Sequence, residues 1–131
     1  MKRIKTDSGT IAPLVAGYLA LILLTLFGSA AVGLTMIATN RVQGITDAAV
    51  LFAHDRSIVR GVPDQNRLQQ HAASFLATAP SVKRIRVLNY QIASQGAVTE
   101  LTLCAGVQNP LWALGEITIC KSARAESFIV P

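Results

Sequence analysis

Hydrophobic residues are concentrated in one uninterrupted segment near the start of the chain, residues 11–38, which contains no charged side chain. A helix needs about 20 apolar residues to cross about 30 Å of hydrocarbon, and at about 1.5 Å per residue this segment reaches roughly 42 Å. A helix also pairs its own backbone groups, as lipid requires. We therefore expect a retained membrane-spanning helix. A cleaved secretory signal is the alternative, since Ser29-Ala30-Ala31 resembles a cleavage site, but such signals have apolar runs of only about 7–15 residues.

The pattern then changes to one apolar stripe on an otherwise polar helix. Apolar residues recur at steps of three and four after residue 38, which is the spacing of one helix face: Val42, Ile45, Ala49, Phe52 and Ala53. Two strong helix breakers follow in Gly61-Val62-Pro63. The sequence therefore predicts a single long helix over about residues 10–60, with its first half in lipid and its second half packed along one face.

A short helix and three strands are predicted for the remainder. Pro63 and Asp64 are start signals for a helix ending near Ala79-Pro80, and its apolar stripe is Leu68, Ala72, Phe75 and Leu76. Alternation then predicts strands over about 85–92, 98–107 and 115–129. In the first of these the alternation shifts by one residue near Leu88, which indicates a bulge or the use of both faces in turn. The expected fold is α+β: a leader over 1–9, the helix over 10–60, and a helix-plus-meander domain over 61–131.

The two cysteines fall opposite each other in this meander. A loop centred near Trp112 aligns Cys104 with Cys120 and Ala105 with Ile119 across neighbouring strands. Directly opposed residues of an antiparallel pair are close enough for a disulfide, so we expect this bond. The same register places Lys121 on the core face, against the apolar pattern. Two lone cysteines without a matching histidine pair lack the spacing of a metal site.

Charge predicts the orientation and limits the partners. Three of the first five residues are basic, namely Lys2, Arg3 and Lys5, and basic residues flanking a span favour the cytoplasmic side. The cysteines then lie in the exported part, where disulfides form. The net charge of +5 forms no dense basic stripe with interleaved aromatics, so nucleic-acid binding is not expected.

Small residues recur along one side of the membrane segment at Ala12, Ala16, Ala20 and Gly28. Small residues four apart let helix backbones approach closely in lipid, so this face is a candidate for helix packing. Ordinary membrane-helix composition is the alternative.

No acid/base pair, nucleophile motif, phosphate loop or cofactor motif is recognisable. His54 and His71 are interpreted as separate helix-surface residues, and Trp112 as packing over the sheet edge or as an exposed anchor for a partner. We expect no enzymatic activity, no cofactor and no small-molecule substrate.

Two short stretches flanking the apolar segment resemble a known family. Asp7-Ser8-Gly9-Thr10 precedes the segment, and residues 41–51, RVQGITDAAVL, follow it. This arrangement is similar to TadE/TadG-like proteins, pilin-related minor subunits of the bacterial tight-adherence (Flp-type) pilus machinery. Arg41 matches the family's arginine, and Asp47-Ala48-Ala49 matches its Ala-Asp-Ala-Ala-like run, with Thr46 where alanine is common.

The resemblance implies a pilin-like fold, a place in the bacterial cell membrane, and partners among other pilin-like subunits and the assembly platform. Gly9 is then the candidate processing site. Processed members carry glutamate at the fifth residue after this glycine, whereas this chain has Leu14. The expected function is a structural minor subunit of a Tad/Flp-type pilus or secretion assembly. The alternative is a membrane-tethered extracytoplasmic binding module.

Overall fold

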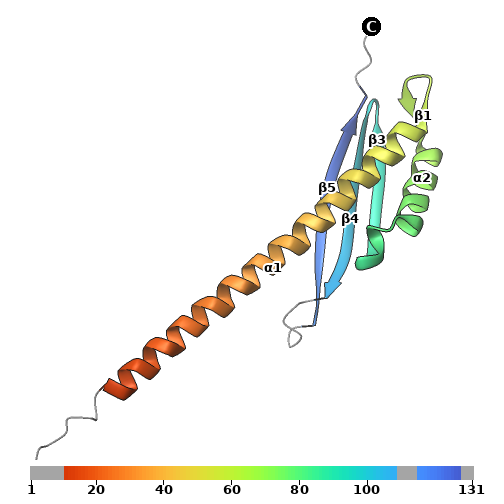
Figure 1. Cartoon of the computed structure of the whole chain (residues 1–131). Helices are drawn as coiled ribbons and strands as arrows, with labels where there is room; N and C mark the ends of the chain where they lie inside the picture. The colour runs from red at the N-terminus through yellow and green to blue at the C-terminus, as the bar shows by residue number, and fades with distance from the viewer. Residues whose placement is uncertain (1–10, 109–114, 128–131) are drawn as a thin grey trace, which may run out of the picture. The chain divides into compact units, whose positions relative to one another are not determined.

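The computed structural model describes residues 11–108 and 115–127 of this chain of 131 residues (Figure 1). The elements in order are α1 (Ile11–Ser57), β1 (Ile58–Val59), β2 (Val62–Pro63), α2 (Gln65–Thr78), the 3-10 helix η1 (Val82–Arg84), β3 (Arg86–Gln95), β4 (Val98–Gln108) and β5 (Glu116–Glu126). The α+β class is confirmed. The chain divides into two compact units, Met1–Leu34 and Thr35–Pro131, and the boundary falls within α1.

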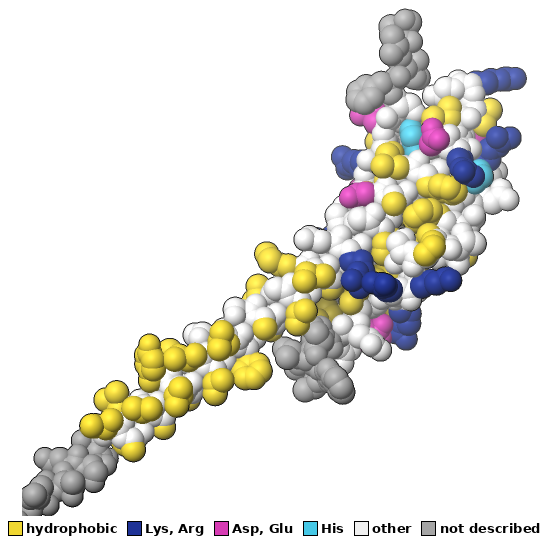
Figure 2. Space-filling view, in the orientation of Figure 1, with side chains coloured by type: hydrophobic (Ala, Val, Ile, Leu, Met, Phe, Trp, Pro, Cys, Tyr) yellow, Lys and Arg dark blue, Asp and Glu magenta, His cyan; other side chains and the backbone are white. Residues whose placement is uncertain are grey.

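The described part of the first unit is the beginning of α1, and its apolar side chains are exposed. Figure 2 shows hydrophobic side chains all along the visible face of this segment. Two of its hydroxyl groups are satisfied within the helix, since Thr25 donates to the carbonyl of Ile22 and Ser29 donates to that of Leu26. By length and composition, α1 is able to cross a membrane.

The part of α1 within the second unit packs through one stripe. Its buried residues recur at steps of three and four, as predicted. They form two adjacent rows on the helix surface: Val42, Ile45, Thr46, Ala49, Val50, Ala53, His54 and Ser57. The apolar members join a core with β4 and β5, which includes Leu101, Leu103 and Ala123. Burial of this stripe stabilises the unit by about 25 cal/mol per Å² of apolar surface removed from water.

The prediction that the first helix continues to residue 60 is wrong, because α1 ends at Ser57 and a small hairpin follows. Strand β1 pairs with β2 through Val59 opposite Val62. Between them Arg60 and Gly61 have φ values of 53° and 85°. Two successive residues with positive φ form a two-residue turn that suits a hairpin. The glycine predicted to stop the helix is therefore part of this turn.

Helix α2 begins where the sequence predicted. The carboxylate of Asp64 accepts a hydrogen bond of 2.9 Å from the backbone amide of Arg67, which satisfies one of the free amides of the first turn. Leu68, Ala72 and Leu76 are buried, and Phe75 packs partly buried beside them. The predicted stripe is confirmed, and it holds α2 against the same core.

Strands β3, β4 and β5 form an antiparallel meander in that order. The predicted register between the last two strands is confirmed, with Cys104 opposite Cys120 and Ala105 opposite Ile119. The phase shift is a bulge, because the pairing of β3 with β4 shifts between Val87 and Asn89. β3 continues to Gln95, beyond the predicted end at residue 92. β5 ends at Glu126, before the predicted end at residue 129, and residues 128 and 129 of that prediction fall outside the described residues.

A polar side chain is associated with each outer strand of the sheet. On β5, Lys121 lies half-buried on the core face opposite Leu103, as the register predicted. On β3, the side-chain amide of Gln65 donates to the carbonyl of Ile92 at 2.9 Å and accepts from the amide of Ser94 at 3.2 Å. Inward-pointing charges and covered backbone groups are two ways in which proteins protect sheet edges.

Candidate functional site

A buried polar cluster around His54 links three parts of the second unit. His54 is only 6% exposed. Its ring Nδ1 is joined to Thr99 Oγ1 at 2.8 Å and its Nε2 to Ser127 Oγ at 2.6 Å. The interpretation of His54 as a helix-surface residue is therefore wrong. Helix α1, strand β4 and the residue directly after β5 are tied together through one imidazole.

The sequence held one signal for this burial. Thr46, Val50 and His54 are four residues apart and continue the buried stripe along its second row. Thr46 in this row donates to the carbonyl of Val42. The partners of His54 lie 45 and 73 positions away, so no local pattern could identify them.

The contact between His54 and Ser127 has the separation of a nucleophile and its base. The group on the other ring nitrogen is the hydroxyl of Thr99, which is fully buried. Hydroxyls both donate and accept, so either tautomer of the neutral ring finds two partners. His54 is almost completely buried between these two hydroxyl groups. The cluster is best understood as a structural tie.

His71, the other histidine, lies half-buried on α2. Its ring makes an edge contact with Phe52, with centroids 6.3 Å apart. Arg56 lies over the same phenyl ring, 4.3 Å from its centroid. These contacts join the two helices, and the two histidines occupy separate environments.

A disulfide joins Cys104 to Cys120, with Cα atoms 4.0 Å apart. It lies on the sheet face opposite the core, where Thr102 and Ser122 share a hydrogen bond of 2.8 Å and Arg124 pairs with Glu100 at 3.3 Å. Within the described residues, no group of three or more potential metal ligands is found. This face therefore contributes a disulfide, a hydrogen bond and an ion pair that link neighbouring strands.

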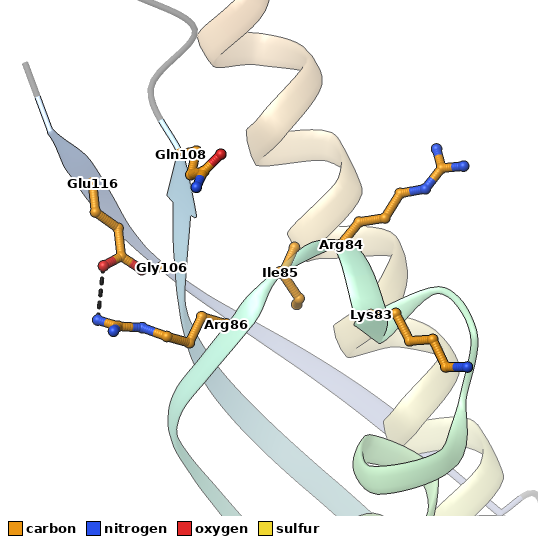
Figure 3. A pocket seen from close by; sticks show the side chains of 7 residues that line it. All are labelled: Lys83, Arg84, Ile85, Arg86, Gly106, Gln108 and Glu116. Atoms are coloured by element: carbon orange, nitrogen blue, oxygen red, sulfur yellow. Dashed lines mark ion pairs between the residues drawn. The ribbon is translucent and has the colours of Figure 1, made fainter. Parts of the chain in front are cut away.

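A basic group at one end of the sheet surrounds a hollow of about 490 Å³. Arg86 of β3 pairs with Glu116 of β5 at 2.7 Å, and Glu116 lies over Gly106 of the central strand, where a Cβ atom would overlap its carboxylate (Figure 3). Lys83 and Arg84 complete the basic lining. Sequence reasoning did not single out this group, although Lys83-Arg84-Ile85-Arg86 is visible as a short basic run.

The small residues predicted to pack against another helix are exposed on α1, namely Ala12, Ala16, Ala20 and Gly28. An added Cβ at Gly28 would meet no atom within 4 Å. Gly9, the basic leader and Trp112 fall outside the described residues.

No family model, no curated protein and no solved structure matches this chain. The case for a function therefore depends on three features of the chain itself: the exposed apolar segment of α1, the packed half of α1 with its sheet, and the polar groups around that sheet.

Proposed function

We propose that the protein is a structural minor subunit, pilin-like in architecture, of a Tad/Flp-type pilus or secretion assembly in the bacterial cell envelope. The observation that carries the proposal is the division of α1. Its first part is apolar and exposed, and its last part buries a stripe against a three-stranded sheet. An anchor continuous with the packing helix of a small domain suits a subunit that assembles from the membrane. The stretches around Gly9 and Arg41 that resemble TadE/TadG-like proteins support the assignment.

The proposed orientation has the N-terminus in the cytoplasm and the residues after about Thr39 outside. The basic leader supports this orientation through the positive-inside bias. The disulfide supports it as well, because such bonds persist in oxidising compartments. A C-terminal fusion to a reporter that works only in the cytoplasm should be inactive, and an active fusion would contradict the orientation.

Partners are proposed to pack against the small face of the membrane segment. In lipid there is no hydrophobic drive between helices, so close backbone approach supplies the attraction. Larger side chains on this face should therefore prevent the partner helix from packing against it. Membrane insertion should not change, because leucine suits lipid as well as alanine does. Insertion and subunit association are then separable by mutation.

The test is the double substitution Ala16→Leu with Ala20→Leu in the full chain. We expect normal membrane insertion, loss of co-purifying pilin-like subunits, and loss of piliation or secretion. The control is Leu14→Phe with Leu21→Phe, which adds bulk on the opposite side of the helix and should leave association intact. A double mutant that inserts, retains its partners and supports assembly would show that the small face is ordinary membrane composition.

A second candidate is a membrane-tethered extracytoplasmic binding module. The observation that favours it is the polar sheet face, where the disulfide lies beside exposed or half-buried polar side chains. Substitutions on this face, such as Gln91→Ala with Thr118→Ala, would then abolish partner capture while the helix variants would not. The opposite result favours the structural subunit.

A further inference from the structure

The second unit has one end that leads into the apolar segment, and the strand register identifies it. Gln43 donates to the carbonyl of Ser122 at 3.4 Å, and eleven residues later His54 reaches Ser127. Helix α1 and strand β5 therefore run in the same direction. The start of β5 at Glu116 lies on the side of Thr35, together with the start of β3 and the end of β4. Residues 35–38, which end the predicted span, belong to this same end of the unit.

This end carries most of the net charge of the unit. Residues 35–131 contain nine Lys or Arg and six Asp or Glu. Three of those cations and one anion lie together at this end, and we call them the basic end: Lys83, Arg84, Arg86 and Glu116. The remaining six cations and five anions nearly cancel. Figure 2 shows Lys and Arg side chains at both ends of the unit.

The cations of the basic end are available to an external partner. All three are exposed. Arg86 retains 69% side-chain exposure while paired with Glu116. Lys83 and Arg84 take part in no ion pair among the described residues. Figure 3 shows Arg86 turned toward Glu116, while Lys83 and Arg84 extend away from this pair. The side chains spread over a surface and do not converge on one point.

We propose that the basic end docks the second unit onto anionic lipid headgroups of the membrane that α1 enters. The inference depends on the membrane anchoring in the proposed function. Basic residues beside a span are attracted to anionic lipid within a Debye length of the surface. A spread of cations suits many headgroups at once, whereas a single small anion would need convergent donors. Docking restricts the tilt of the unit, and so fixes which face it presents to a neighbouring subunit.

The test uses the full chain in lipid nanodiscs, with a paramagnetic chelate on a trace headgroup. Broadening of the backbone amide signals of residues 83–86 and 116–118 is compared with that of Gly96, at the turn between β3 and β4. We expect strong, selective broadening in discs of phosphatidylglycerol mixed with phosphatidylcholine. It should be weak in discs of phosphatidylcholine alone, and weak at about 1 M salt, where the Debye length falls to about 3 Å.

The decisive variant is Lys83→Glu with Arg84→Glu. Attraction of about fivefold per basic residue predicts a fall of at least 25-fold in the ratio of docked to undocked protein. The matched control is Arg60→Glu with Arg67→Glu, which makes the same charge change away from the basic end and should leave the broadening unchanged.

Anchoring is measured separately, by flotation of the chain with vesicles of either lipid. A chain that fails to float with both would overturn the membrane proposal and the docking with it. A chain that floats, but whose broadening is indifferent to lipid charge or equally reduced by both variants, would refute the docking alone.

Discussion

The substitution His54→Leu tests whether the buried imidazole stabilises the second unit. It removes both ring nitrogens from a position that is only 6% exposed. Thr99 Oγ1 then loses its partner in a residue with no exposed surface, and a buried hydroxyl without a partner costs about 1–3 kcal/mol. Ser127 is half-buried, so water replaces its bond at little cost. We expect a loss of about 2 kcal/mol, which for a unit of this size lowers Tm by about 8–16 °C.

The assay is thermal unfolding of the full chain in detergent micelles, monitored by the amide signals of β4 and β5. The matched control is His71→Leu, which removes a half-buried ring that has an edge contact with Phe52 and no hydrogen bond among the described residues. We expect the control to change stability by less than about 0.5 kcal/mol.

A double-mutant cycle then separates the hydrogen bond from simple loss of packing. Thr99→Val alone leaves the ring nitrogen of His54 unpaired and should cost about as much as His54→Leu. When both partners are replaced no polar atom is stranded, so the pair should cost about 1–2 kcal/mol less than the sum of the single changes. Additive losses, or a His54→Leu variant as stable as the parent, would refute the role assigned to this cluster.

Two further outcomes follow from the sheet. Cys104→Ser with Cys120→Ser opens a loop of about 15 residues and should lower stability by about 3 kcal/mol in the chain-entropy model, and urea unfolding that differs little from an oxidised parent would contradict this. Gly106→Ala places a Cβ on the Glu116 carboxylate. It should separate Glu116 from Arg86 at a cost of at most about 1 kcal/mol, because exposed ion pairs contribute little. The cost should fall in an Arg86→Ala background, and a loss unchanged in that background would place the strain elsewhere.

The features that the sequence predicted correctly depend on local repetition. Steps of three and four located the buried side of α1 and of α2. Alternation with a central loop aligned Cys104 with Cys120, because a two-residue period permits few registers when one face is buried. The predicted end of α1 was wrong because a glycine with positive φ occurs both after the end of a helix and in a hairpin turn. Only the tertiary pairing of Val59 with Val62 decides between them. His54 was assigned to the surface because its two hydroxyl partners lie 45 and 73 positions away in the sequence.

The contacts of Gln65 with β3, and Lys121 on β5, affect how copies of the protein interact at high local concentration. When many copies are held side by side, any open strand competes for pairing with its neighbour. A strand added beside β5 would have to enclose the ammonium group of Lys121, and one added beside β3 would have to displace the amide of Gln65 from Ile92 and Ser94. Copies of the chain held side by side are therefore less able to form continuous sheets across chains.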